Sequence, residues 1–241
     1  MCNPAYQVVQ AILYRLKTGC QWRQLPTRQF FQTKYSWESV YYHFKKWSKD
    51  GSWDSLWNTL RAKYKNQLDL SSAQLDGTHT PAKRGGGAVA HQGRKKAKTS
   101  NMLIMTDSQG LPVTYSEPIS GNHNDAYNIL DIAKEMILDL KQVGINHEVL
   151  FLNADAGFDV KKFRDFLEAE EIVGNIDFNK KNNSEYKYLF DELLYKERFV
   201  VERTNAWLDA FKGLLIRFET KTTHWKSMNI LAFIVIWLRK L

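Results

Sequence analysis

The sequence predicts an α/β fold in which a mixed sheet is flanked by helices and preceded by a small helical region. Three patterns indicate it. Apolar residues recur at intervals of three and four through the first 70 residues, as in amphipathic helices. Strand-like segments joined by a turn come next, and strands then alternate with helical segments. The 241 residues, 44% hydrophobic, are enough to bury a core, and we divide them into residues 1–70 and 71–241.

Three amphipathic helices are expected in the first region. The first runs from Ala5 to about Lys17 and ends at Gly19. The second begins after Ser36, whose hydroxyl suits an N-cap. The third follows a turn and reaches Tyr64. The tryptophans of this region recur at helical spacing and predict a small apolar core: Trp22, Trp37, Trp47, Trp53 and Trp57.

The second region is expected to begin with antiparallel strands and to continue with strands and helices in alternation. The expected strands are 73–76, 102–106, 111–116, 148–153 and 172–176, with a hairpin turn at 107–110. The expected helices are 124–141, 160–170, 196–213 and a last one from residue 225. The polar stretch 178–187 predicts a loop.

Charge and composition favour a nucleic-acid partner. Lys and Arg number 34 against 26 acidic residues, which gives a net charge of +8 and a pI near 9.3. The two cysteines offer no disulfide framework, which favours a reducing, intracellular compartment. The most apolar stretch, Ile230 to Leu238, is shorter than a bilayer requires, and no secretory signal is evident. We therefore expect a cytoplasmic protein without a membrane anchor.

Three carboxylates are the candidate catalytic groups. Asp76 ends a predicted strand immediately before Gly77, and a second strand delivers Asp155 to a tip bounded by Gly157, so the two carboxylates could face one another. Glu202 lies seven residues after Tyr195 and four after Arg198, which puts all three on nearly one face of a helix. The alternatives are ordinary turn aspartates and a solvated Arg–Glu pair.

Three carboxylates brought together need a cation to offset their repulsion. Oxygen ligands of this kind favour Mg²⁺ or Mn²⁺ over zinc. A pair of such ions can activate an attacking oxygen and stabilise the leaving oxygen at phosphorus. The carboxylates thus predict a metal site with two ions and the chemistry of a nuclease or strand transferase.

A basic, glycine-rich segment lies between Asp76 and the second predicted strand. Glycine lets backbone approach a phosphate closely, and cations attract a DNA backbone whatever its sequence. The alternative is a solvated basic hairpin. The candidate DNA-binding residues of this segment are Lys83, Arg84, Arg94, Lys95, Lys96 and Lys98.

With these residues in view, the chain resembles bacterial DDE transposases of the insertion-sequence-five group. LDGTHTPAKRGG resembles the family segment with the first catalytic aspartate, Asp76, and LNADAGFD the segment with the second, Asp155. Tyr195, Arg198 and Glu202 resemble the family's tyrosine, arginine, glutamate signature. AILYRLKTGCQWRQLP and SWESVYYHFKKWSKDGSWDSL resemble its helical N-terminal region.

The resemblance implies a ribonuclease-H-like catalytic domain over residues 71–241 and a DNA-binding helical region over 1–70. It also implies a divalent metal pair, binding to the inverted repeats of double-stranded transposon DNA and to target DNA, and a homo-oligomer, a dimer on DNA. The implied reaction is cleavage at transposon ends and attack of the freed 3′-hydroxyl on target DNA. A bacterial, nucleoid-associated location follows from it.

The sequence departs from the family pattern at two places. Asp209 stands where the signature usually has a basic residue, and we expect Lys212 to contact DNA instead. Relatives usually carry further residues before this start, so the chain is expected to be shortened. Two other functions stay open: a transposase remnant that binds DNA without catalysis, and a ribonuclease-H-type nuclease that does not join DNA.

Other residues compete for these roles. Asp159 is an alternative to Asp155, which we prefer because it is nearer the strand end. Asp125 is expected to cap a helix, and His123 to be a hydrogen-bonded loop histidine. Trp207 lies off the face of Tyr195 and is expected in the core.

Overall fold

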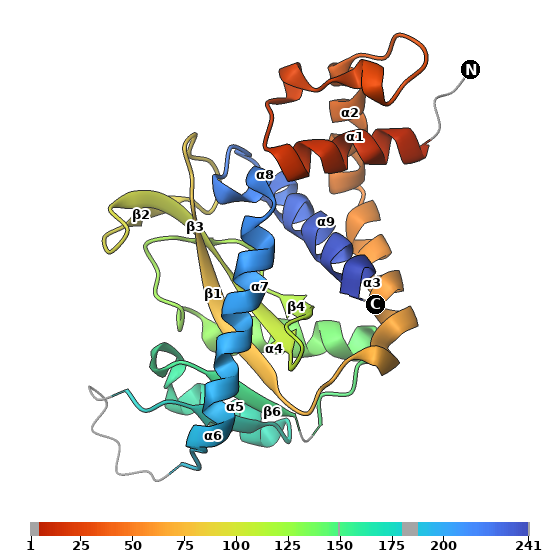
Figure 1. Cartoon of the computed structure of the whole chain (residues 1–241). Coiled ribbons are helices and arrows are strands. Elements are labelled where there is room, and N and C mark those ends of the chain that lie inside the picture. The colour runs from red at the N-terminus through yellow and green to blue at the C-terminus, as the bar shows by residue number, and fades with distance from the viewer. Residues whose placement is uncertain (1–4, 149, 180–187, 241) are drawn as a thin grey trace.

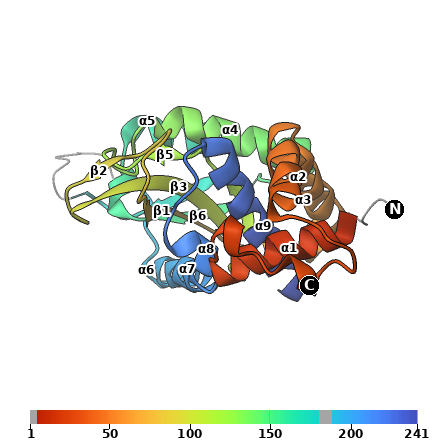
Figure 2. The same cartoon turned by 90° about the horizontal axis from the view of Figure 1, so that it is seen from above.

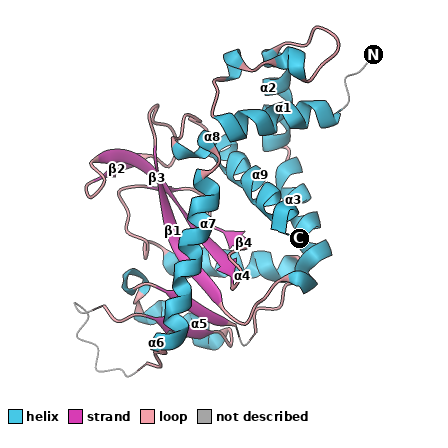
Figure 3. Ribbon diagram, in the orientation of Figure 1, coloured by secondary structure: helices cyan, strands magenta, loops and turns pink. Residues whose placement is uncertain are grey.

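The computed structural model describes residues 5–148, 150–179 and 188–240. Its centre is a seven-stranded mixed sheet with helices on both faces (Figures 1 and 3). The strand order is β2-β3-β1-β6-β7, and β4 and β5 also pair with β3. The predicted fold class is confirmed.

The three N-terminal helices occur where the apolar spacing predicts them. They are α1 (Ala5–Thr18), α2 (Trp37–Lys49) and α3 (Ser52–Tyr64). The hydroxyl of Ser36 accepts a hydrogen bond from the Ser39 amide and caps α2, as expected.

Two strands of the sheet are longer than predicted. Pairing between β1 and β3 is antiparallel and continues from Ala73 to Pro81, so the polar residues after Gly77 stay in the sheet through cross-strand hydrogen bonds. β6 and β7 run parallel to β1. The short strands β2 and β5 were not predicted. The strands are β1 (Ala73–Pro81), β2 (Ala90–Gln92), β3 (Ala97–Asp107), β4 (Pro112–Tyr115), β5 (Ile119–Ser120), β6 (Phe151–Ala154) and β7 (Val173–Ile176).

Two predicted helices need correction. The expected helix 124–141 begins only at Ile129, because the preceding residues form turns. The expected continuous helix 196–213 is broken: a 3₁₀ turn, Lys196–Phe199, joins α6 to α7, and α8 follows separately. Val149 and residues 180–187 of the predicted loop lie outside the described residues. The helices are α4 (Ile129–Gln142), α5 (Lys161–Ala169), α6 (Glu192–Tyr195), α7 (Val200–Asp209), α8 (Lys212–Leu215) and α9 (Thr222–Lys240).

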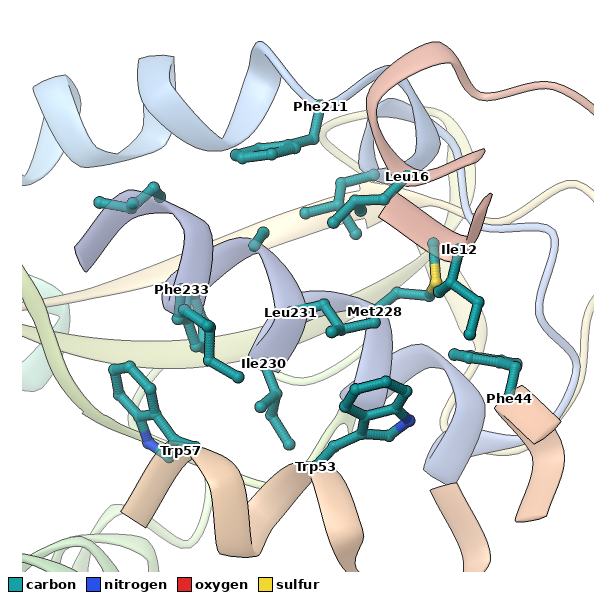
Figure 4. Close-up of a cluster of buried hydrophobic side chains, with 14 of the residues drawn as sticks. Ile12, Leu16, Phe44, Trp53, Trp57, Phe211, Met228, Ile230, Leu231 and Phe233 are labelled. Atoms are coloured by element: carbon teal, nitrogen blue, oxygen red, sulfur yellow. The ribbon is translucent and has the colours of Figure 1, made fainter. Parts of the chain in front are cut away.

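The sheet separates two apolar clusters. On one face α4 and α5 cover side chains such as Leu75 and Leu103, while α7 lies along the other (Figure 2). On that second face Trp57 of α3 packs against Phe233 of α9 (Figure 4). The N-terminal helices therefore share their core with the C-terminal helix, and the division at residue 70 stays a prediction. In the part of the chain described, no helix is both long and apolar enough to cross a bilayer.

Candidate active site

The sheet register makes Asp76 and Asp155 neighbours. The parallel pairing of β1 with β6 ends at Leu75 opposite Ala154, and the two aspartates come next on their strands. Adjacent strands lie about 4.8 Å apart. The expectation that Asp76 ends its strand is wrong, because it pairs with Ile104 and β1 continues. Only the pairing of β1 with β6 ends there: its last pair is Leu75 with Ala154, so β6 does not pair with the backbone of Asp76.

A row of buried amides precedes this pair on the same face of the sheet. Gln74, Asn153 and Asn175 lie opposite one another on β1, β6 and β7. Asn175 donates to Asn153 Oδ1 at 2.7 Å and accepts from the Asp191 amide at 2.8 Å. Asp191 in turn caps α6 by accepting from the Leu193 amide at 2.8 Å. The row thus fixes the start of α6 over the strands that carry the aspartates.

The three helical candidates lie in and just after α6, whose start is fixed in this way. Tyr195 ends α6, Arg198 lies in the 3₁₀ turn and Glu202 lies in the first turn of α7. The guanidinium of Arg198 lies 5.8 Å from the centre of the Tyr195 ring. α7 packs against β1 (Figure 1). A broken helix therefore still carries the three residues over the strands that bear the aspartates.

Electrostatic coupling joins the residues of this site. Burial, with smaller contributions from the charges of Asp155 and Glu202, raises the pKa of Asp76 to about 6. The hydrogen bond from the Gly77 amide and the positive charge of Arg198 oppose that rise. Like charges are thus close enough to disfavour ionisation of Asp76.

The phenol of Tyr195 belongs to the same neighbourhood. Burial raises its pKa, Asp177 and Asp155 add to the rise, and Arg198 opposes it. A raised pKa keeps the hydroxyl protonated and able to donate a hydrogen bond. The structure therefore brings together all five residues that the sequence singled out as catalytic.

The donor chemistry of the site fits a hard divalent cation. Burial is the largest cause of the raised pKa of Asp76, and a cation among the three carboxylates would remove the part of the rise that comes from Asp155 and Glu202. Within the described ranges, no three His, Cys, Asp or Glu side chains are already grouped closely enough to hold a metal ion. The charges of these carboxylates affect one another, but their side chains do not yet form a complete set of metal ligands.

Asp159, the alternative to Asp155, has a structural role. Its side chain is buried and pairs with Arg164, with Oδ1 lying 2.8 Å from Nε. Its other oxygen accepts from the Asn179 amide at 2.9 Å. Asp155 is half-buried at the strand end and accepts from the Gly157 amide. The geometry favours Asp155 as the residue that faces Asp76.

Asp125 does not cap a helix, contrary to the prediction. Asn128 precedes α4, and the Asp125 carboxylate instead accepts from Asn101 Nδ2 at 2.8 Å. A hydrogen bond from His79, assisted by the one from Asn101, lowers the pKa of Asp125. A Cβ on Gly77 would lie 2.4 Å from its Oδ1, so Asp125 packs directly behind the backbone that follows Asp76.

His123 and Trp207 take no part in the site as described. The ring of His123 stacks on Tyr127 with their centres 3.5 Å apart. Trp207 packs against the apolar cluster on the α9 side of the sheet, as expected.

Sequence reasoning missed Asp177 and the amide row. Asp177 follows β7 at the register position next to Asp155 and acts on the pKa of Tyr195. A signal existed, because each of the aspartates Asp76, Asp155 and Asp177 is preceded two positions earlier by an amide: QLD, NAD and NID. Alternate strand positions share one face, so the repeated pair indicates one polar face across three strands.

The predicted basic residues lie in two places. Six are exposed on the segments around β2, where Lys95 Nζ donates to the carbonyl of His79 at 2.8 Å. Lys212 begins α8, beyond the end of α7. About 10 Å of helix separates Glu202 from Asp209, so Lys212 lies at the far end of α7 from the carboxylates. The six are Lys83, Arg84, Arg94, Lys95, Lys96 and Lys98.

Comparison with known families and structures agrees with this fold. Residues 3–57 match a family model described as "Putative transposase of IS4/5 family", and residues 72–238 match the model "Transposase DDE domain". Among curated proteins, nothing matches.

Solved structures resemble the chain at low identity. The piggyBac transposase synaptic complex with hairpin DNA is 11% identical, with a TM-score of 0.50, over 97% of this chain and 64% of that one. The Mos1 strand transfer complex is 12% identical, with a TM-score of 0.34, over 99% and 78%. A Mos1 mariner paired-end complex with Mn is 12% identical, with a TM-score of 0.35, over 99% and 78%. The chain thus spans less than two thirds of the length of piggyBac transposase.

Proposed function

The chain belongs to the transposase DDE-domain family, and from that membership we propose that it cuts DNA at the ends of a transposable element and joins the freed 3′-hydroxyl to target DNA. The observation that carries this proposal is that Asp76 and Asp155 come directly after the last paired positions of β1 and β6, and that the charges of Glu202 and Arg198 act on Asp76. Such a group of carboxylates suits in-line displacement at a phosphodiester.

Asp76, Asp155 and Glu202 would hold two divalent ions, Mg²⁺ or Mn²⁺. When bound, such ions activate the attacking oxygen and offset charge on the leaving oxygen. Arg198 would hold a phosphate oxygen of the scissile strand through its guanidinium, which suits phosphate geometry. Tyr195, kept protonated by burial, would donate a hydrogen bond to the same phosphate.

Double-stranded DNA, as inverted repeats and as target, is the proposed partner. The exposed cations around β2 would contact its backbone; among them, Lys95 Nζ donates to the His79 carbonyl and the charge of Arg94 acts on Asp125. Lys212 would contact DNA at the other end of α7. We also propose a dimer on DNA, since the two ends of an element must be brought together, and a bacterial nucleoid location, since the DNA substrate is there.

The test is cleavage of a duplex carrying the element's own ends, with and without Mg²⁺. Asp76→Asn and Glu202→Gln should each reduce the rate at least a hundredfold. Asp131→Asn, a carboxylate change exposed on α4, should cut at the parental rate. Undiminished cutting by Asp76→Asn would remove the carboxylates from the mechanism.

Two alternatives have distinct outcomes in the same experiments. Asp209, at the place where the family usually has a basic residue, favours a remnant that binds DNA without cutting it. Salt-sensitive binding without cleavage at any metal concentration would indicate that remnant. A nuclease without joining activity would cut the ends but would not insert a precut end into a target plasmid.

A further inference from the structure

A cavity of about 600 Å³ lies away from the carboxylates, between the N-terminal helices and the C-terminal segment. Trp22 and Tyr41 line it from the first 57 residues, and Phe218 and Lys221 line it from the segment before α9. Arg84, from the loop after β1, completes its wall. The cavity exists only where the two parts of the chain meet.

The lining of the cavity is cationic. Arg15, Arg23, Arg84 and Lys221 contribute positive charge, and Glu219 is the acidic residue among the lining side chains. Arg15 Nη2 already pairs with Glu219 Oε1, and both side chains are more than nine-tenths buried. The cavity therefore keeps an excess of positive charge, which suits a phosphate-bearing ligand.

Flat aromatic rings share the lining with these cations. The guanidinium of Arg15 lies 4.7 Å from the Trp22 ring centre, and that ring lies 4.9 Å from Tyr41. Phe218 is 48% exposed although it is a large apolar residue. Exposed aromatic rings beside cations stack on nucleobases, because every base has a π-face.

The cavity wall is held in place before any ligand binds. Arg217 is buried and donates to the Gly87 carbonyl at 2.8 Å, and the Gly87 amide donates to the Thr220 carbonyl at 3.1 Å. The Lys83 amide donates to the Arg217 carbonyl at 3.1 Å. These bonds fix the loop that carries Arg84 against the segment that carries Phe218, so a ligand would meet a formed site.

We propose that this cavity binds a nucleotide, with its phosphate on the cations and its base on Phe218 and the neighbouring rings. The volume lies within the range of about 300 to 1,000 Å³ usual for small-molecule sites. The nucleotide comes either from an unpaired stretch of a DNA strand or from the free pool. The site is separate from the carboxylates and needs no metal.

The experiment uses the full chain in EDTA and a single-stranded oligonucleotide that contains 2-aminopurine, whose fluorescence is quenched by stacking. Binding should quench the probe. Phe218→Ala should weaken binding about tenfold and remove the quenching, while Phe218→Tyr should retain both. Arg84→Ala and Lys221→Ala should weaken binding and lower its salt dependence, each by about 0.7 in the logarithmic slope.

Leu138→Ala and Lys134→Ala, exposed on α4, are the matched controls and should bind as the parent does. Titration with dAMP distinguishes the sources: binding at comparable affinity indicates a free nucleotide, and binding of the oligonucleotide alone indicates a DNA strand. Inorganic phosphate that competes as well as dAMP would overturn the proposal, as would quenching that survives in Phe218→Ala. Asp76→Asn should still bind the oligonucleotide in this cavity. A loss of nucleotide binding in the Phe218→Ala variant and a loss of DNA cleavage in the Asp76→Asn variant are therefore separate outcomes.

Discussion

Two opposing effects act on the ionisation of the Asp76 carboxylate. Its carboxylate must be ionised to bind a cation, yet burial and neighbouring negative charges raise its pKa to about 6. The folded chain therefore holds a carboxylate that is less stable ionised than it would be in the unfolded chain. A residue that costs stability at neutral pH is typical of a functional site.

Asp76→Asn should stabilise the metal-free protein above pH 6. The folded-state pKa is raised above the ordinary 3.8, so the ionised carboxylate destabilises the fold fully above pH 6 and not at all below about pH 3.5. The variant should gain on the order of 2 kcal/mol in unfolding free energy at pH 7.5 in EDTA, and nothing at pH 3.5. Urea denaturation at both pH values measures this, and equal effects at the two would contradict it.

Asp155 and Asp159 should differ sharply in their effect on stability. Asp159→Asn leaves the buried guanidinium of Arg164 without its carboxylate, which costs roughly 3 kcal/mol. Asp155→Asn keeps a capping side chain at a half-buried position and should cost less than about 1 kcal/mol. Thermal unfolding of both variants compares them, and the reverse order would exclude the assignment of Asp155 to the site.

At the scale of elements, α6 and the turn after it hold the helical residues over the sheet. The cap from Asp191 and the amide of Asn175 fix the start of α6. The hydroxyl of Ser72 bonds Glu197 at 2.8 Å and ties the 3₁₀ turn to the chain before β1. These contacts place Tyr195 and Arg198 next to the aspartates.

Asp191→Ala should cost about 1 kcal/mol of stability and slow DNA cleavage more than the stability loss explains. The start of α6 would fray and Arg198 would lose its fixed position. Asp191→Asn, which can still cap, should restore both properties. Differential scanning calorimetry and the cleavage assay measure them, and a similar cleavage defect in both variants would disprove a capping role.

The sequence was sufficient to predict most elements, and the five candidate site residues stay a prediction; it failed where local structure depends on partners that are distant in the sequence. β1 and β3 extend through polar residues because each supplies the other's hydrogen bonds, which no local pattern records. The helix after Tyr195 contains a 3₁₀ turn although its apolar spacing is continuous. The role of Asp125 depends on Asn101, which the sheet brings beside it.

At the scale of the whole molecule, a partly buried ion pair ties the N-terminal helices to the sheet domain. Arg61 of α3 is fully buried and forms two hydrogen bonds to Asp139 of α4, at 2.6 and 2.7 Å, and one to the Val113 carbonyl. Together with the shared core around Trp57 and Phe233, this pair predicts that both parts of the chain unfold together.

Asp139→Asn should cost about 3 to 5 kcal/mol, because it leaves a fully buried guanidinium without its countercharge. Unfolding followed by far-UV circular dichroism and by tryptophan fluorescence should give coincident transitions in parent and variant. Asp131→Asn, exposed on the same helix, should match the parent. Two separated transitions in the parent would mean that the N-terminal helices fold independently.

Iron-directed cleavage of the protein backbone tests most directly whether the three carboxylates share a cation. Fe²⁺ with ascorbate replaces Mg²⁺ and cuts the polypeptide close to where the ion is bound. The chain should be cut near Asp76, near Asp155 and near Glu202, and excess Mg²⁺ should suppress all three cuts. Cutting at only one of these positions, or elsewhere in the chain, would contradict a shared metal site.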